Sequence, residues 1–533
     1  MRLRTLFTVA ALGLTMALPL AAVTSTPAAA KTFRWANDGD VNSMDPYARN
    51  ETFLLSFNLN IYEPLVRRTA DLKKDPGLAT EWKATSPTVW QFKLRQGVKF
   101  SDGTPFTADD VVFSYGRAVG PGSNIGTAFA SVKEVRKIDD FTVEVETKYP
   151  NPIFVDEITN WGIMSKAWCE KNNAVNSADL TKNEENFATR NAMGTGPFML
   201  KSREPDVKTV LVPNPGWWDK PQHNLTEVVF QRIANGATRV AALKSGEIDM
   251  VYTIPPQDVE PLKKSDGISV LEGPETRVVY LGFDQARDEL LYSNIKGKNP
   301  FKDPKVRLAF WQAIDTDAIK TRVMRGQSQP VALMWAPGIN GYSKDVDVRP
   351  KYDPEASKKL LAEAGYDKGF ELTLDCPNDR YVNDEAICQA VTAMLARVGV
   401  KVTLRAQNRL KYFAQILGPK YDTSFYMLGW TPATYDAHNA MQALMQTRDN
   451  KQIGLFNVGG WSNKKFDDLA NTIAQELDQP KRDAMIKEAA IIHRDEVGHI
   501  PLHQQYVVWA ARKNIDLKQQ ADNMFPLRFV KVN

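Results

Sequence analysis

Histidine and cysteine are scarce in this chain of 533 residues, which contains five of the first and three of the second. Metal sites draw heavily on these two residue types, so the composition offers little for one. His493, His499 and His503 are close in sequence, but ligands six and ten residues apart do not share one helix face, and Pro501 interrupts the segment. The sequence therefore predicts no metal site and no cofactor.

Several sequence motifs typical of enzyme active sites are missing as well. The chain has no G-x-S-x-G elbow, no G-x-x-x-x-G-K-[ST] phosphate loop, no H-E-x-x-H helix and no C-x-x-C pair. The "GTGPF" segment at residues 194–198 is similar to a phosphate cradle, but it is short and Pro197 removes one of the N–H donors that a cradle needs. We therefore expect a tight turn there, no catalytic residues, and a protein that is not an enzyme.

Long hydrophobic runs are absent except near the N-terminus, where residues 6–23 follow Arg2 and Arg4. Small residues just before Lys31 complete the pattern of a secretory signal peptide over residues 1–30. A membrane anchor is the alternative, but a glycine and a proline interrupt the run. We therefore expect export to the periplasm, and without a cysteine directly after the cleavage site a lipid anchor is not expected.

A strong excess of one charge is lacking too. The net charge is +4, and loss of residues 1–30 with their two arginines lowers it to +2. Nucleic-acid-binding domains usually carry a pronounced basic surface, so nucleic acid is not an expected partner. A hydrophobic content of 43% and a charged content of 24% are ordinary for a soluble globular protein, and the length suggests two or three domains.

The three cysteines permit at most one internal disulfide, which the oxidising conditions outside the cytoplasm would favour. Cys376 and Cys388 flank a loop rich in Pro, Asn and Asp, "CPNDRYVNDEAIC". Closing so short a loop would stabilise the fold by about 3 kcal/mol. We predict this pair, with Cys169 left as a buried thiol, while the alternative of three free cysteines stays open.

Short strands alternate with helices along the chain. Residues 88–100 and 141–146 alternate apolar and polar side chains, as half-buried antiparallel strands do. Helices that begin with Asp-Pro are predicted at Asp303 and Asp353, and a helix with a capping box at residues 107–110. These patterns predict α/β lobes. No Gly/Ser-rich or Pro-rich linker separates them, so we expect discontinuous domains joined by hinge strands.

Residues 78–118, "LATEWKATSPTVWQFKLRQGVKFSDGTPFTADDVVFSYGRA", closely resemble the signature region of one family of exported proteins. These are the bacterial extracellular solute-binding proteins of the dipeptide, oligopeptide and nickel group, which deliver ligand to ATP-driven importers. Similar segments continue along nearly the whole chain, among them "NSMDPYARNE", "GTGPFML", "VPNPGWWDKP", "TRVAALKSGEIDMVY" and "MLGW". The chain is therefore identified as a member of this family.

The resemblance implies an α/β fold of two lobes, the type II periplasmic-binding-protein or flytrap fold, with an extra domain inserted in the first lobe. The implied ranges are 31–61, 195–287 and 504–533 for the first lobe, 62–194 for the inserted domain and 288–503 for the second lobe. The implied partners are a small-molecule ligand, enclosed between the lobes, and the permease and ATPase subunits of an ABC importer. We expect a monomer.

The resemblance also implies that "GWTPATYDAHN", residues 429–439, lies at the ligand cleft. In peptide-binding members an Asp a few residues after the Gly-Trp pair anchors the ligand's α-amino group, whereas this chain has Ala433 there. Trp430 matches the family's pocket aromatic, and Tyr435 resembles an aromatic of nickel-chelate members. Asp436 could replace the missing anchor, although its family counterpart is often structural.

A ligand carboxylate would suit an arginine, whose planar guanidinium can bind both oxygens at once. In the family the carboxylate-binding residue lies on a loop between a second-lobe strand and the next helix, and Arg380 occupies that loop between the two cysteines that we predict to be bridged. Arg49 and Asn50 match a first-lobe loop that touches ligand in several members. Trp161 occupies the place of a pocket residue on the inserted domain.

Three classes of ligand stay open within the family. A short peptide or peptide-like solute, held through its main chain, is the first hypothesis. The loss of the amine anchor at Ala433 favours the second, which is an opine, a glycosylated or phosphorylated amino compound or a glutathione-like peptide. A nickel chelate is the third, and the scarcity of histidine weakens it. From other classes, a receptor that only signals stays possible, and an exported hydrolase is not expected.

Overall fold

The computed structural model describes residues 31–418, 420–449 and 453–533. The predicted signal peptide, residues 1–30, lies outside the described residues. Within the described ranges, no helix combines the length and the apolar character that crossing a membrane requires.

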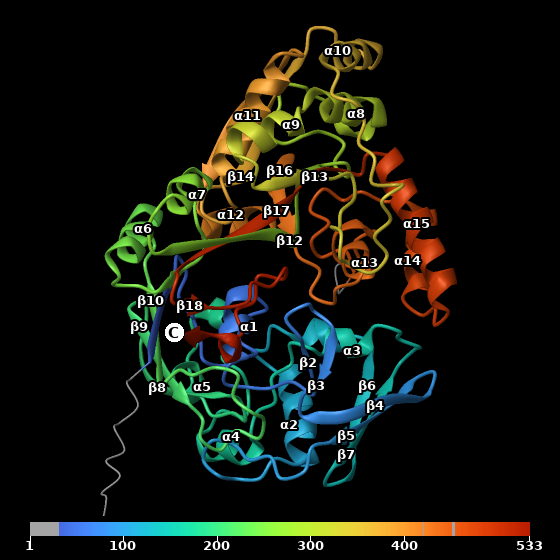
Figure 1. Ribbon diagram of the computed structural model, residues 1–533. Helices are drawn as coiled ribbons and strands as arrows, with labels where there is room; N and C mark the ends of the chain where they lie inside the picture. Colours follow the sequence, from blue (N-terminus) through green and yellow to red (C-terminus); the bar gives the residue numbers. More distant parts are fainter. Residues whose placement is uncertain (1–30, 419, 450–452) are drawn as a thin grey trace, which may run out of the picture.

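One large mixed sheet runs through the middle of the molecule (Figure 1). Its eleven strands follow the order β15-β14-β16-β12-β17-β11-β1-β10-β9-β8, with β13 beside β17. The bounds are β1 Thr32–Asn37, β8 Phe198–Glu204, β9 Lys208–Pro213, β10 Glu227–Arg232, β11 Met250–Val251, β12 Ile268–Phe283, β13 Ser328–Pro330, β14 Phe370–Pro377, β15 Val400–Gln407, β16 Phe425–Trp430 and β17 His499–Arg512.

Two long strands, β12 and β17, join the two halves of this sheet. They have 16 and 14 residues and pair antiparallel along most of their length. On one side β12 pairs with β16, and on the other β17 pairs with β11. The register between them shifts from Pro274 to Val278, which marks an irregularity where the chain passes from one half to the other. Such a bulge bends a strand and re-aims its side chains.

Helices cover the two halves of the large sheet. In Figure 1, α8 to α11 lie at the end of the molecule that holds β14, while α14 and α15 lie along one side. The bounds are α1 Thr52–Asn58, α3 Phe154–Glu157, α4 Lys166–Lys171, α5 Phe187–Arg190, α6 Gly236–Ser245, α7 Pro256–Lys263, α8 Pro304–Ala313, α9 Thr316–Ala318, α10 Pro354–Glu363, α11 Asp384–Ala396, α12 Arg409–Ile416, α13 Ala437–Ala440, α14 Lys464–Ile473 and α15 Gln479–Asp495.

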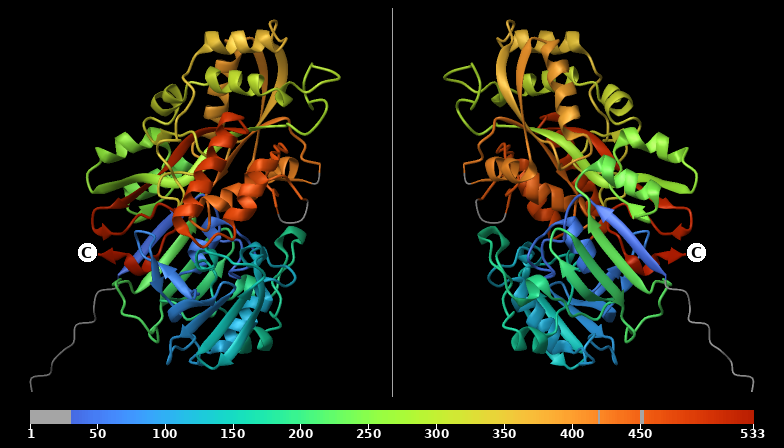
Figure 2. Two further views of the ribbon diagram at one scale, coloured as in Figure 1. Left: turned by 90° about the vertical axis from the view of Figure 1, so that its right-hand side faces the viewer. Right: turned by 90° about the vertical axis from the view of Figure 1, so that its left-hand side faces the viewer.

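A separate four-stranded antiparallel sheet lies at the end of the molecule opposite α10 (Figures 1 and 2). Its order is β4-β5-β7-β6, and α2, Ala108–Ala118, packs on it. The predicted alternation is present in the second half of β5, where Phe92 and Leu94 are buried and Lys93 between them is exposed. On β7, Val143 and Val145 are buried as predicted, but Thr142, which was predicted to face the other way, is buried as well. The strands are β4 Ala79–Ser86, β5 Val89–Leu94, β6 Val132–Asp139 and β7 Thr142–Thr147, with two small ladders formed by β2 Val66–Arg68 and β3 Lys74–Pro76 and by β18 Ile515–Asp516 and β19 Lys531–Val532.

The predicted helix starts are also confirmed. Asp303 accepts a hydrogen bond from the N–H of Lys305 at 2.8 Å, and Asp353 accepts one from Ala356 at 2.9 Å. The capping box of residues 107–110 is present at the start of α2. Each cap satisfies an N–H group that the first helical turn leaves without an intrahelical partner. Local sequence was therefore sufficient to locate these helices.

Candidate ligand-binding site

A cavity of about 580 Å³ lies between the two halves of the molecule. One wall is formed by the segment after β1, by the start of α1 and by residues 252–256, and the other by residues 379–383 and by α12. The walls come close together, since a Cβ atom placed on Gly39 would lie 3.7 Å from the Arg409 guanidinium. Both the volume and the position between two lobes are typical of small-molecule sites.

The lining of this cavity is rich in charge. Six of its residues are arginines and five are acids. Some of these charges already have protein partners: Asp206 contacts Arg232 at 2.9 Å, and Arg277 contacts Glu275 at 3.0 Å. The groups left without such a partner decide which ligand the cavity favours.

Like Arg409 on α12, Arg380 on the second wall is an arginine of this kind. It follows β14 on the loop that leads into α11, and no carboxylate among the described residues lies within ion-pair distance of its guanidinium. The guanidinium lies 5.3 Å from the centre of the Tyr381 ring. Burial, and then the neighbouring Arg277, lower the pKa of Arg380. An anion bound beside Arg380 would relieve both effects.

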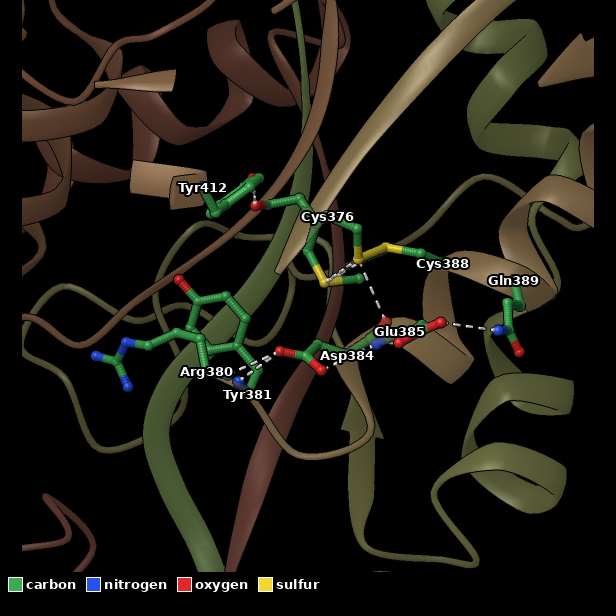
Figure 3. The surroundings of a disulfide bond; sticks show 9 residues. Cys376, Arg380, Tyr381, Asp384, Glu385, Cys388, Gln389 and Tyr412 are labelled. Atoms are coloured by element: carbon green, nitrogen blue, oxygen red, sulfur yellow. Dashed lines mark hydrogen bonds between the residues drawn. A yellow bond between two sulfur atoms is a disulfide. The ribbon is translucent and has the colours of Figure 1, made fainter. Parts of the chain in front are cut away.

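The loop that carries Arg380 is fixed at its backbone. Asp384, the first residue of α11, accepts hydrogen bonds from the N–H groups of Arg380 at 2.9 Å and Tyr381 at 3.0 Å. The predicted pairing of the cysteines is present in the structure, where a disulfide joins Cys376 to Cys388 (Figure 3). As predicted, Cys169 is a buried free thiol. Arg380 therefore lies on a short loop that is held at several points.

A buried polar chain connects this loop to the strands between the two halves. The Gln505 side-chain oxygen on β17 accepts the N–H of Val382 at 3.1 Å, and its amide group donates to Glu275 at 2.7 Å. Glu275 in turn accepts from Arg277 at 3.0 Å, and both lie in the irregular part of β12. Arg277 was not among the residues predicted from the sequence to contact the ligand. Its signal was present in the sequence, because Glu275 and Arg277 come directly before the apolar run of residues 278–283 that ends this strand.

Of the predicted first-lobe residues, Arg49 lines the large cavity and Asn50 does not. Asn50 is exposed, and its backbone N–H donates to the Asn124 side chain at 3.0 Å. Its neighbour Glu51 lines the cavity instead, while one of its carboxylate oxygens accepts the N–H of Leu54 and so caps α1.

The segment of residues 429–439 lies outside the lining of the large cavity. The Trp430 indole donates to Asn439 at 2.9 Å, and its ring packs 4.8 Å from Phe456. Asp436 is buried, and its two oxygens each accept a hydrogen bond from Arg482 at 2.7 Å. This ion pair gives Asp436 a structural partner, in line with the structural role that its family counterpart often has. Ala433 is exposed.

Tyr435 lines a second cavity of about 70 Å³, together with residues of α1 and of the C-terminal segment. Its hydroxyl donates to Asp522 at 2.6 Å, and the Arg68 guanidinium lies 4.0 Å from the centre of its ring. Tyr435 therefore contacts two parts of the chain that are distant from it in the sequence, Arg68 on β2 and Asp522 in the C-terminal segment.

Trp161 is buried in the part of the molecule that holds the four-stranded sheet. Its indole donates to the Tyr47 hydroxyl at 3.0 Å, and Phe129 packs against its ring at 4.9 Å. It lines neither of the two cavities described above. This geometry gives Trp161 a place in the hydrophobic core, in contrast to its predicted pocket position.

The three clustered histidines are buried. Nε2 of His493 lies 2.9 Å from Nδ1 of His499, whereas neither ring nitrogen of His503 has a hydrogen-bond partner among the described residues. Burial lowers the pKa of His499 and of His503 to about 3 in each case, so both rings are neutral at pH 7. Across the described ranges no group of three or more potential metal-binding side chains is found.

Comparison with known proteins identifies the family to which this architecture belongs. The family model described as bacterial extracellular solute-binding proteins, family 5 Middle, matches residues 74–452. The chain belongs to this family. Its predicted role, solute binding for an ABC importer, agrees with that membership, and the family is one of binding proteins and not of enzymes.

Relatives of this solute-binding protein match it over nearly their full length. The glutathione-binding protein GsiB of Shigella dysenteriae is 27% identical over 513 residues, which cover 95% of this chain and 94% of the relative. The dipeptide-binding protein of Escherichia coli (strain K12) is 28% identical over 515 residues, 91% of each chain.

The fold agrees with solved structures of periplasmic binding proteins. DppA from Helicobacter pylori, solved in complex with the peptide STSA, superposes with a TM-score of 0.79 at 24% identity and covers 94% of this chain and 98% of DppA. The predicted α/β fold of the two-lobe, type II class is therefore confirmed.

Proposed function

We propose that this protein captures a small peptide or peptide-like solute with a free carboxylate and delivers it to the permease of an ABC importer. The observation that carries the proposal is Arg380, whose guanidinium has no counter-ion among the described residues and which lies on the wall of a cavity that a small solute would fill. A carboxylate bound there would make charge-assisted hydrogen bonds, which are about twice as strong as neutral ones. Arg277, whose charge is paired with Glu275, lies beside the same Tyr381 ring as Arg380.

Closure of two lobes around the solute would be the functional step. In this proposal the lobes and the inserted domain have the ranges given by the sequence, and the irregular part of β12 lies at the hinge. The protein would act as a monomer in the periplasm after removal of residues 1–30, and it would leave its ligand chemically unchanged. Capture and release need only contacts that differ between the open and the closed state.

The amino end of the ligand is the point at which this chain departs from peptide-binding members. Ala433 is exposed and supplies no charge, and Asp436 is occupied by Arg482. This favours, as a second candidate, a ligand whose amino end differs from the α-amino end of an ordinary peptide, such as a glutathione-like peptide or an opine. The name of one relative, glutathione-binding protein, is compatible with that candidate.

The test is a binding screen with two arginine variants. Purified protein is screened by thermal shift against dipeptides, tripeptides, glutathione and opines, and isothermal titration then measures the dissociation constant of each compound that stabilises it. Arg380→Ala should weaken binding of a carboxylate ligand about 10- to 100-fold, since a hydrogen bond to a charged group contributes about 1.5–3 kcal/mol. Arg232→Ala is the matched control, because Arg232 lines the same cavity but contacts Asp206 at 2.9 Å.

Three results would count against the proposal. If Arg380→Ala and Arg232→Ala weaken binding equally, Arg380 is not the carboxylate contact. If only compounds without a carboxylate bind, the proposed class of ligand is wrong. Turnover of a bound compound would contradict the role as a binding protein.

A further inference from the structure

The loop that carries Arg380 is closed into a ring by a disulfide. Cys376 is the second-last residue of β14, and Cys388 lies in the second turn of α11, twelve residues later in the sequence. Residues 379–383, which line the large cavity, all lie within this ring. The disulfide therefore fixes the strand end and the helix start from which the cavity wall is built.

Asp384 lies inside the ring and contacts its backbone. Figure 3 shows its carboxylate between the disulfide and the backbone of Arg380, while the Arg380 side chain extends away from the disulfide. Besides the bonds from Arg380 and Tyr381, the carboxylate accepts the N–H of Glu385 at 2.9 Å. The position of Arg380 thus depends on the position of Asp384, and the position of Asp384 depends on how α11 is held against β14.

The loop needs this restraint because Arg277 and Arg380 carry the same charge. Each lies beside the Tyr381 ring, at 5.8 Å and 5.3 Å from its centre. Arg277 contacts Glu275, but no carboxylate among the described residues lies within ion-pair distance of Arg380, and the repulsion of Arg380 by Arg277 is larger than its separate attraction by Glu51 or by Glu275. A loop free to move would relax this repulsion by turning Arg380 outward, and binding would then have to restore its position.

We propose that the disulfide between Cys376 and Cys388 is a positioning element for ligand binding, which keeps Arg380 in the cavity and so sets the preference for a carboxylate over a neutral group. This inference rests on the proposed function. Both sulfur-bearing side chains are fully buried, so the bond is shielded from solvent. Charged groups that are already held in their binding positions bind a ligand more tightly, because the conformational entropy of ordering them is lost on folding and not on binding.

The test compares carboxylate and amide forms of the same ligand. The probes are the dipeptide Met-Leu and glutathione, each with its free carboxyl end and as the amide of that end. Isothermal titration gives the ratio of the two dissociation constants for the unmodified protein, for Cys376→Ala with Cys388→Ala, and for Arg380→Ala. We expect a preference for the carboxylate of about tenfold or more in the unmodified protein, and of less than about threefold in both variants.

A matched control separates positioning from stability. Ser357→Ala removes a buried hydroxyl that donates to the carbonyl of Ala309 at 2.7 Å, within the second half of the chain but away from the cavity lining. It should lower the unfolding temperature and leave the carboxylate preference unchanged. If the double cysteine variant does not fold, Asp384→Asn tests the same loop with the disulfide intact, and it should reduce the preference and accelerate hydrogen exchange at the amides of Arg380 and Tyr381.

The possible outcomes distinguish the two proposals. An unchanged preference without the disulfide, together with a lost preference in Arg380→Ala, would overturn the positioning role and leave the proposed function intact. A preference that Arg380→Ala does not alter would overturn the carboxylate contact itself, and the positioning role with it. Failure of both probes to bind in either form would reject the proposed peptide-like ligand and the inference that depends on it.

Discussion

Replacing Asp436 by Asn tests whether this residue stabilises the fold or contacts the ligand. The side chains of Asp436 and Arg482 are each 1% exposed, and two hydrogen bonds of 2.7 Å join them. Asn has nearly the same volume but no charge, so Asp436→Asn leaves the Arg482 guanidinium buried without a counter-ion. Breaking a buried pair in this way costs about 3–5 kcal/mol. We expect a loss of this size in the free energy of unfolding.

Urea denaturation followed by tryptophan fluorescence measures that loss, and titration with ligand measures affinity in the same variants. Adding Arg482→Met to Asp436→Asn should restore more than half of the lost stability, because an apolar side chain then occupies the space of the unpaired charge. Ligand affinity should change less than about threefold in the double variant. A stability loss below about 1 kcal/mol, combined with a large loss of affinity, would refute the structural role and return Asp436 to the ligand site.

Three further outcomes follow from other parts of the structure. His503 has its pKa lowered from 6.5 to about 3 by burial and by nearby Arg349, so below pH 6.5 the unfolded chain gains a proton that the folded protein does not. The free energy of unfolding should therefore fall as the pH drops from 7 to 5, and His503→Leu should make this fall smaller by about 2 kcal/mol. Urea titrations at the two pH values measure the difference, and an equal fall in the variant would contradict the prediction. A Cβ on Gly369 would lie 1.8 Å from the Gly399 carbonyl oxygen, whereas one on Gly103 would meet nothing within 4 Å, and both residues have positive φ. Gly369→Ala should thus destabilise by several times the roughly 1–2 kcal/mol of Gly103→Ala, and equal melting temperatures would disprove the steric argument. Tyr435→Phe removes the hydrogen bond from Tyr435 to Asp522, which connects the two halves of the molecule, and should weaken ligand binding about threefold to tenfold. Small-angle scattering should show a more open ligand-free protein. Unaltered affinity and scattering would exclude a role of this hydrogen bond in closure.

Local features of this chain could be predicted from the sequence with good accuracy. The starts of α8 and α10 follow from their Asp-Pro pairs, and the exposure pattern of β5 follows from its alternation, because each depends on residues within one turn or one strand. The pairing of Cys376 with Cys388 was predictable for the same reason, since both cysteines lie within one strand–loop–helix unit.

The candidate site could be predicted only in part. Arg380 and Arg49 were recognised from family position, and both line the cavity. Asp436 has the same appearance in the sequence as an amine anchor, and only its contact with Arg482, 46 residues later, shows what its carboxylate binds. Trp161 is similar, because an aromatic residue fits a pocket and a core equally well until its neighbours are known.

The sequence by itself determined the family, the α/β class, the exchange of an anchoring Asp for Ala433, and the short loop that carries Arg380. The tertiary structure alone decided which charges remain without partners. Glu275 and Gln505 are separated by 230 residues, yet they form one hydrogen-bonded chain to the Arg380 loop because β12 and β17 lie side by side. Whether a charged side chain is free to bind a ligand depends on such distant neighbours, since burial and counter-ions set the energy of a charge and neither is recorded in the local sequence.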